Sequence, residues 1–305
     1  MIDPLSDIIG LLRPQAVFTK GISGAGRWGV RYGDFGHPSF AVVIEGACRL
    51  AVDGQAELRL GAGDFVLLPR TPGFTMSGFE PVTPELIDPH VAAAATGEVR
   101  HGRQDGPPAV RILGGYFVFG NEDSGLLVSL LPKQIHVRGV ERLSTLIGLL
   151  VDEAALDRPG RALVLTRLVE ILLVEALRLA PGTDAPLGLL RGLGDPRLAE
   201  AIRLMHADPA RPWTMANLAK EVALSRSAFF ERFVRNVGVP PMEYLLAWRM
   251  ALAKNLLRQQ EIDIAEVAER VGYGSASTFS TAFSRYVGQP PGRYARTASQ
   301  HRVGA

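Results

Sequence analysis

Six histidines and one cysteine are the side chains from which a metal centre or a nucleophilic site would be built. The histidines stand at positions 37, 90, 101, 136, 206 and 301, and no His-x-His pair occurs. A catalytic metal needs several clustered ligands, and the single cysteine, Cys48, can form neither an internal disulfide nor a multi-cysteine cluster. We therefore expect no metal, no cofactor and no enzymatic activity.

The last third of the chain carries a different chemistry, in a segment that occurs twice. Residues 213–244 recur about fifty positions later, first at an offset of 49 and then at an offset of 50. One residue is therefore added in the turn of the second copy. The matched pairs are Ala219 and Ala268, Val222 and Val271, Ala223 and Gly272, Phe229 and Phe279, Phe233 and Phe283, and Gly238 and Gly288.

Each copy has the pattern of a helix-turn-helix. A small residue stands where the helices cross, a small residue or glycine occupies the turn, and a phenylalanine anchors the second helix. Thr214 and Ser225 are predicted N-caps for the two helices of the first copy. Such a helix pair can also belong to an ordinary helical core, but two copies on a basic segment favour a binding role.

Charge is divided unevenly along the chain. Residues 1–193 contain 18 Lys and Arg against 21 Asp and Glu, a net charge of −3, whereas residues 194–305 contain 15 against 10, a net charge of +5. The two values add to the +2 of the whole chain. A basic half joined to an acidic half suggests that the basic half handles nucleic acid.

The elements that position these residues change from strands to helices along the chain. Short β-rich runs between Trp28 and Val118, with a hairpin turn at Asp53-Gly54, predict a sandwich or barrel. Residues 83–108 lack periodicity and indicate a loop. Apolar residues at helical spacing predict a helical hairpin over 140–180, and the glycine- and proline-rich segment 181–194 indicates a linker.

The length of 305 residues, with 47% hydrophobic and 21% charged residues, is typical of about two globular domains. No run approaches the roughly 20 apolar residues of a membrane span. The N-terminus also lacks the basic start, apolar stretch and cleavage site of an export signal. We expect a cytoplasmic protein with no membrane partner.

Two motifs in the second copy resemble the signature of the AraC/XylS family of bacterial transcription regulators. The resemblance covers residues 195–297. It implies two helix-turn-helix units, 213–235 and 262–287, that bind successive major-groove segments of one duplex. The motifs are Val271-Gly272-Tyr273-Gly274-Ser275-Ala276-Ser277-Thr278-Phe279-Ser280-Thr281-Ala282-Phe283 and Gly288-Gln289-Pro290-Pro291-Gly292-Arg293-Tyr294.

The resemblance also implies a long helix, from Pro241 to about Leu257, that joins the two units. It would span about 25 Å, on the scale needed to approach the roughly 34 Å helical repeat of DNA. Arg249 on this helix would either brace the two units or meet a phosphate.

In the first unit, the resemblance implies that the second helix begins near Ser225 and enters the groove. Phe230 either packs on the joining helix or contacts a thymine methyl group, and Glu231 either accepts from a cytosine amino group or stays solvated. The implied groove-facing residues are Arg226, Ser227, Phe230 and Glu231, with Arg232 and Arg235 toward the DNA backbone.

The matching positions of the second unit are small. Where Thr281 stands, family members often carry a long basic or amide side chain. We therefore expect the second helix mainly to hold phosphates, through its N-terminus, its hydroxyls and Arg285, and specificity to rest chiefly on the first unit. The implied DNA-binding residues here are Ser275, Ala276, Ser277, Ser280, Thr281 and Arg285.

The segment Gly61-Ala62-Gly63-Asp64-Phe65-Val66-Leu67-Leu68-Pro69-Arg70 resembles the Gly-Asp strand and proline-ended turn of cupin barrels, in particular the ligand-binding cupin ahead of some AraC-family DNA-binding domains. Where that subgroup often has histidines, this chain has Ala41 and Phe74. We expect either a filled core or an apolar pocket for a small organic effector. The expected lining is Phe40, Val42, Leu67, Phe74, Met76 and Phe117.

The hairpin over 140–180 carries more leucine than packing on one domain requires. In relatives of this type such helices dimerise, and a two-fold homodimer would match two promoter half-sites. Packing on the barrel is the alternative explanation of the same leucines.

These observations predict an α+β protein of two domains. Residues 1–180 would form a cupin-like sensor and dimerisation domain, a β-barrel with a helical hairpin, and residues 195–298 an all-α AraC-type DNA-binding domain. We expect a sequence-specific transcription regulator that binds double-stranded promoter DNA, and RNA polymerase if it activates. The alternatives are a metal-dependent cupin enzyme fused to a DNA-binding module and a nucleoid-type binder with little sequence preference.

Overall fold

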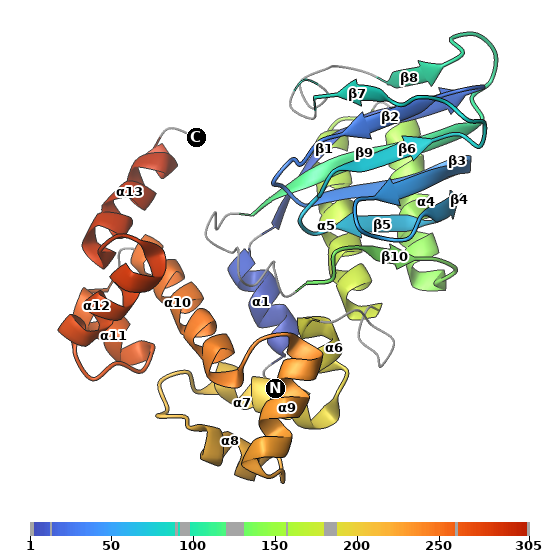
Figure 1. Ribbon diagram of the computed structural model, residues 1–305. Helices are drawn as coiled ribbons and strands as arrows, with labels where there is room; N and C mark the ends of the chain where they lie inside the picture. The colour runs from blue at the N-terminus through green and yellow to red at the C-terminus, as the bar shows by residue number, and fades with distance from the viewer. Residues whose placement is uncertain are drawn as a thin grey trace. The chain divides into compact units, whose positions relative to one another are not determined.

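The structure is a computed structural model that describes residues 3–12, 14–88, 91, 98–119, 131–156, 158–179, 188–259 and 262–303. Its internal contacts divide the chain into two compact units (Figure 1). The barrel unit comprises residues 14–120 and 132–180, and the helical unit comprises residues 1–13, 121–131 and 181–305.

Strands of the described residues form a curled sheet in the barrel unit (Figure 1). Seven strands follow one another in the order β7-β2-β6-β3-β9-β1-β8, while β4 pairs with β3 and β5 lies between β3 and β10. Two of the pairings, β1 with β8 and β2 with β7, are parallel. The strands are β1 (Pro14–Ala25), β2 (Gly29–Tyr32), β3 (Ser39–Val52), β4 (Leu58–Gly61), β5 (Phe65–Leu68), β6 (Phe74–Ser77), β7 (Glu85–Ile87), β8 (Val99–Gly102), β9 (Val110–Phe119) and β10 (Ile135–Val137).

A bend at Gly46 lets the long strand β3 take part in both halves of the sheet. The first half of β3 pairs with β5 and β9, and the second half pairs with β4 and β6. Gly46 has a φ of 74°, and a Cβ at this position would lie 1.9 Å from the carbonyl oxygen of Ala109. Only glycine fits, because it lacks a Cβ and tolerates positive φ.

Around β5 and the first half of β3, both faces of the sheet are apolar, because each is covered. The inner face encloses a core that includes Val43, Leu50, Met76 and Ile112. On the other face lie the helices α4 (Glu141–Ala155) and α5 (Arg161–Leu179), with α5 packed against β1, β5 and β10. The predicted fold class, a barrel with a helical hairpin followed by a helical region, is confirmed.

The Gly-Asp turn is held by the buried carboxylate of Asp64. This carboxylate accepts hydrogen bonds from the backbone N–H of Gly61, at 2.8 Å, and from Nε of Arg138, at 2.8 Å. Burial alone would raise the pKa of Asp64, but these hydrogen bonds outweigh it and lower the pKa. The ion pair ties the β4–β5 turn to the residue that follows β10.

Four strands differ from the sequence prediction, one of them β10, which follows the predicted strand region. β1 precedes Trp28, where strands were expected to begin, and β7 and β8 lie inside residues 83–108, which were expected to form a loop. β7 and β8 have only three and four residues, most of them exposed or half-buried. Such short edge strands leave no alternating pattern of apolar and polar residues.

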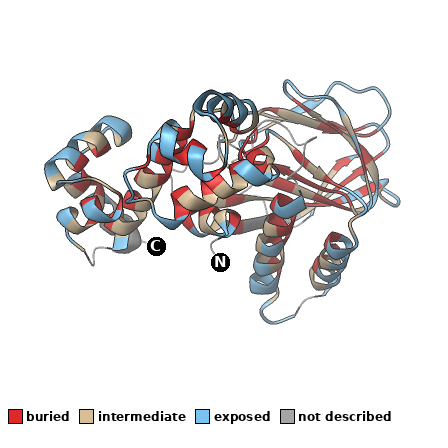
Figure 2. Cartoon of the chain, turned by 90° about the horizontal axis from the view of Figure 1, so that it is seen from below, coloured by how far each residue is buried: buried red, intermediate tan, exposed pale blue. Residues whose placement is uncertain are grey.

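The helical unit contains the predicted two helix pairs and several further helices. Its elements are α1 (Pro4–Leu12), α6 (Leu189–Leu193), α7 (Pro196–Ala207), α8 (Met215–Glu221), α9 (Arg226–Val237), α10 (Pro241–Gln259), α11 (Ile264–Arg270), α12 (Ala276–Val287) and α13 (Pro291–Val303). Most of these helices have one buried and one exposed side (Figure 2). No helix among the described residues is long and apolar enough to cross a membrane.

Two boundaries differ from those expected. The segment 181–194 was expected to be a linker, but α6 lies within it, buries Leu189 and Leu190, and packs on α9; residues 181–187 lie outside the described residues. The N-terminal helix α1 was expected in the sensor domain, yet it groups with the helical unit, where it packs on α7 and α10.

The contact of α1 includes a buried polar chain. Nδ1 of His206 lies 3.3 Å from a carboxylate oxygen of Asp7, and Nε2 lies 2.8 Å from the hydroxyl of Tyr244. The ring also stacks on Trp248, with centroids 3.6 Å apart. Burial lowers the pKa of His206 to about 3, so the neutral ring donates from Nδ1 and accepts at Nε2.

Candidate functional site

The first helix-turn-helix unit is formed by α8 and α9. The hydroxyl of Thr214 accepts from the N–H of Asn217, at 3.1 Å, and that of Ser225 accepts from the N–H of Ala228, at 3.2 Å. These are the predicted caps, and they set where each helix begins. Ala223 in the turn has a φ of 52°, and Phe229 is fully buried beneath α9.

The second unit, formed by α11 and α12, repeats this architecture. Its caps are Asp263 and Ser275, whose side chains accept from the N–H groups of Glu266, at 2.7 Å, and Thr278, at 3.1 Å. Gly272 takes the turn position with a φ of 80°. The turn between the helices spans 271–275 here and 222–225 in the first unit, which accounts for the change of offset in the repeat.

The joining helix α10 has 19 residues, about 28 Å at 1.5 Å per residue. Arg249 on this helix donates from Nε to the carbonyl oxygen of Pro209, at 2.8 Å, and from Nη2 to that of Arg211, at 2.9 Å. Its guanidinium also lies beside Gly272, where a Cβ would come within 2.8 Å of Nη2. Of the two roles left open for Arg249, the structure has it bracing the units.

On α9, most of the candidate DNA-binding side chains are free. Arg226, Ser227, Glu231 and Arg235 are exposed, as is Phe230, whose exposed fraction is 44%. This exposure leaves part of the Phe230 ring available to a partner, and a contact of its covered part with α10 stays a second prediction. Arg232 is different, because its Nε lies 2.5 Å from a carboxylate oxygen of Asp195.

Asp195 also caps α7, since it accepts from the N–H groups of Arg197 and Leu198. Arg197 in turn donates to the carbonyl oxygen of Ala223, at 2.8 Å. Arg232 therefore ties α9 to α7 and holds it in place, a role that the sequence reasoning did not assign. The sequence does mark Asp195 as a cap, because proline follows it at the first helical position. The contact with Arg232, however, arises only when the chain folds.

On α12, most of the candidate side chains are short, and some already form hydrogen bonds to the backbone of their own helix. Ser275 serves as the N-cap, and the hydroxyl of Thr281 donates to the carbonyl oxygen of Ser277, at 3.1 Å. Ala276 and Ser280 are half-buried. The long exposed candidate is Arg285, in the last turn.

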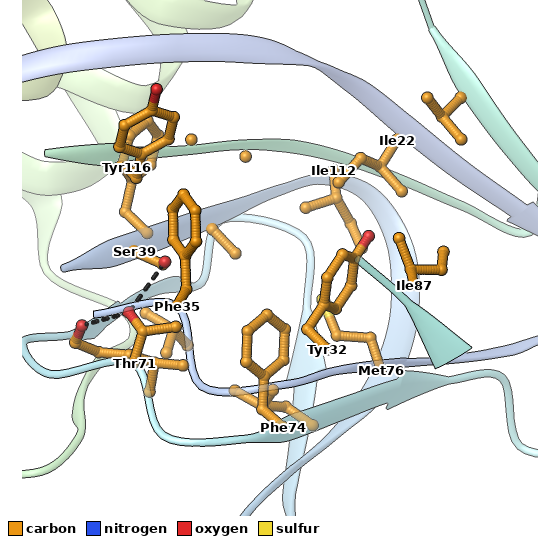
Figure 3. A pocket seen from close by; sticks show the side chains of 18 of the residues that line it. Ile22, Tyr32, Phe35, Ser39, Thr71, Phe74, Met76, Ile87, Ile112 and Tyr116 are labelled. Atoms are coloured by element: carbon orange, nitrogen blue, oxygen red, sulfur yellow. Dashed lines mark hydrogen bonds between the residues drawn. The ribbon is translucent and has the colours of Figure 1, made fainter. Parts of the chain in front are cut away.

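The barrel unit contains a partly open apolar cavity of about 250 Å³. The labelled rings of Tyr32, Phe35, Phe74 and Tyr116 surround it (Figure 3). The rings of Tyr32 and Phe74 stack with centroids 4.9 Å apart. At one end, the hydroxyl of Thr71 lies 2.9 Å from that of Ser39 (Figure 3).

The expected lining is corrected by the strand register. Phe40, Phe74 and Met76 line the cavity, whereas Val42, Leu67 and Phe117 are absent from its lining although they are buried. Val42 and Leu67 alternate with Ala41, Val66 and Leu68, which do line it, so they belong to the opposite face of the sheet. Phe40 borders the cavity although it shares the side of Val42 on β3, and its ring packs on Phe117 with centroids 5.3 Å apart. Residues that the sequence reasoning missed include Tyr32, Phe35, Thr71, Ile112 and Tyr116.

The cavity wall carries few groups that could do acid–base or metal chemistry. Its lining contains hydroxyl groups but no histidine, cysteine or carboxylate among the described residues. Ala41 and Phe74, which take the places where histidines were noted as common, both face it. No group of three His, Cys, Asp or Glu side chains in the described part of the chain is arranged to hold a metal ion.

Comparisons with known proteins agree with this architecture. A cupin family model matches residues 3–180, and a helix-turn-helix domain model matches residues 218–297. A putative AraC-like transcription regulator of Streptomyces lividans is 39% identical over 302 residues, 96% of this chain and 98% of its own. A second, from Streptomyces antibioticus, is 37% identical over the same shares.

Among solved structures, the DNA-binding domain of AdpA in complex with a target DNA is 27% identical and covers 36% of this chain and 99% of its own, with a TM-score of 0.34. The identity and coverage of the Streptomyces relatives extend over both units, and the matched models fall on the barrel and on the paired helices. The chain belongs to the AraC-like family of transcription regulators and carries a cupin region ahead of its helix-turn-helix domain.

Proposed function

We propose that this DNA-binding regulator reads its promoter mainly with α9 and uses α12 mainly to hold the duplex backbone. The observation that carries the proposal is the difference between two matched surfaces on one scaffold. α9 presents Arg226, Ser227, Phe230 and Glu231, which have apolar, acidic and basic chemistry that can distinguish base edges. α12 presents small residues and Arg285, which suit phosphate contacts that carry no sequence information.

The experiment compares one substitution on α9 with one on α12 in full-length protein. Binding sites are first selected from a random DNA pool, and affinity is then measured on selected and scrambled half-sites over a range of salt. Glu231→Gln should change which sequences bind. Arg285→Ala should weaken binding to all sequences alike and reduce the salt slope by about one. Equal sequence sensitivity in both half-sites would contradict the proposal.

We infer that the barrel cavity binds a small uncharged effector. Its volume of about 250 Å³ is below the roughly 300–1,000 Å³ of pockets for drug-sized ligands, so a single ring or a short alkyl chain fits best. The apolar wall supplies contact area, and the hydroxyls at Ser39, Thr71 and Tyr116 can orient one polar group. A charged ligand would lose its hydration without a partner of opposite charge.

The test is a thermal-shift screen of small uncharged aromatic and aliphatic compounds with the full chain. Ala41→Phe places a ring in the cavity and should abolish the shift by any active compound. A matched control is Ala51→Phe, at a half-buried position on the same strand that is absent from the cavity lining. An unchanged shift in Ala41→Phe would exclude this cavity as the site.

We also propose that the helical hairpin forms a homodimer. Large apolar side chains on the hairpin of α4 and α5 support this, since about half of each remains exposed. They are Leu149, Leu156, Leu163, Val164, Ile171 and Leu179, with exposed fractions of 42–62%. Leu163→Glu should reduce the mass measured by light scattering at micromolar concentration, whereas the control Leu86→Glu, on exposed β7, should not; a monomeric wild-type chain would refute the proposal.

We infer that the protein has no enzymatic activity and acts in the cytoplasm, where promoter DNA is found. The naming of its relatives as transcription regulators and the absence of histidine, cysteine and carboxylate side chains from the described cavity wall support this. Stoichiometric iron, manganese or zinc in the purified protein would favour the alternative of a metal-dependent cupin.

A further inference from the structure

The side chain of Phe230 is the least explained group on the DNA-facing helix. Successive helix residues turn by about 100°, so Phe229, Phe233 and Val237 share the buried side of α9. Phe230 is 100° from Phe229 but only about 20° from Val237 around the helix, so it borders the buried side, and 44% of it is exposed. Among the described residues, its ring has no aromatic partner, whereas those of Phe229 and Phe233 pack together.

The contacts of other α9 residues indicate which way Phe230 points. Arg232 and Asn236 lie on the side that faces α6 and α7, where they are bonded to Asp195 and Arg191. Phe230 is about 160° from Arg232 around the helix and shares the free side with Ser227, one turn before it. This free side also carries Arg226, a cation that suits the phosphates beside a groove.

The major groove of DNA presents one common apolar group, the 5-methyl of thymine. An exposed phenylalanine cannot hydrogen-bond to any base edge, so the methyl group is its natural counterpart. In the second unit, the matching position is Ser280, half-buried and polar. The two units therefore differ in apolar character at this position.

We propose that Phe230 is a specificity-determining residue that contacts the methyl group of a thymine in the half-site bound by the first unit. This inference rests on the proposed function, in which α9 reads the promoter. The inference adds three details to that function: the base is a thymine, the group contacted is its methyl, and the side chain that contacts it is Phe230.

The test replaces thymine by uracil, which removes only the methyl group and leaves the hydrogen-bonding edge unchanged. Sites obtained by selection from a random pool are resynthesised with one uracil at a time, and the affinity of full-length protein is measured by fluorescence anisotropy. Loss of one buried methyl contact should weaken wild-type binding about fourfold at one or two positions. Other positions should be unaffected.

Two variants assign the effect. Phe230→Ser copies the residue of the second unit and should weaken binding to the thymine site about tenfold, with no remaining difference between thymine and uracil. Ser227→Ala, one turn away on the same exposed side, should keep the fourfold ratio. Circular dichroism and thermal melting establish that both variants are folded, as expected for exposed positions.

Three results would count against the inference. Specific binding by the wild type with no effect of any uracil would overturn it while leaving the proposed function intact. A thymine preference that persists in Phe230→Ser would assign the methyl contact to another residue and also overturn it. If selection yields no preferred sequence, then the proposed reading role of α9 itself fails.

Discussion

Replacing Gly272 by alanine should destabilise the second helix-turn-helix unit by about 3 kcal/mol. Two costs contribute. Gly272 has a φ of 80°, and a left-handed conformation costs an L-residue about 1–2 kcal/mol. An added Cβ would also lie 2.9 Å from the carbonyl oxygen of Ala210 and 2.8 Å from Nη2 of Arg249, and such overpacking costs about 1–3 kcal/mol.

The repeat supplies a matched control, because Ala223 already occupies the same turn position in the first unit, with a φ of 52°. Ala223→Gly should be neutral or slightly stabilising, since relief of the left-handed strain is offset by about 0.5–1 kcal/mol of glycine entropy. Hydrogen exchange of peptides covering 264–287 should become about 100-fold faster in Gly272→Ala, since 1.4 kcal/mol corresponds to a factor of ten. A change below tenfold, or an equal loss in the first unit of Ala223→Gly, would refute the steric reasoning.

Other changes have equally definite expected results. The pKa of His206 is lowered to about 3, whereas an unfolded histidine titrates near 6.5. Between these values the unfolded chain binds a proton that the folded chain does not, so stability should fall on acidification by up to about 1.4 kcal/mol per pH unit; His206→Asn should reduce this slope in urea unfolding between pH 7 and 5. Arg232→Gln should leave the salt slope of DNA binding unchanged, because Asp195 already neutralises this guanidinium, whereas Arg226→Gln should lower it by about one; equal slopes in both variants would assign Arg232 to phosphate after all. Arg249→Met removes two hydrogen bonds to carbonyl oxygens and should cost about 1–3 kcal/mol, and an unaltered urea midpoint would show that the brace is dispensable.

The helix-turn-helix units could be predicted in detail because their determinants are local. Caps such as Ser225 bond to a residue three positions later, and the repeat compares each turn with a second example. Contacts between distant residues gave no such signal. Asp195 and Arg232 are 37 positions apart, and Asp7 and His206 are 199 apart. A local sequence pattern therefore predicts neither the ion pair that joins α9 to α7 nor the packing of α1 on the helical unit.

Only three of the six predicted lining residues line the cavity, because the side of a strand that faces inward depends on contacts between distant strands. Alternation along a strand divides its residues into two sets, and a strand with one solvated face shows which set is buried. Here helices cover the outer face of the sheet, so Phe40, Ala41 and Val42 are all apolar and the pattern does not reveal which of them faces inward. The pairing of β3 with β5 and β9 decides this.

The two helix-turn-helix units separate what folds the domain from what reads DNA. Their buried residues, Phe229 and Phe279 among them, are of the same type, and their caps and left-handed turns are equivalent. The differences lie where the side chains are exposed or half-buried, as at Phe230 and Ser280. Stability therefore cannot explain why one surface has large and charged side chains and the other small ones, because neither set contributes much to a core. The proposed function attributes the difference to an outside partner, a DNA duplex that meets both units at once and whose two groove segments would be read unequally.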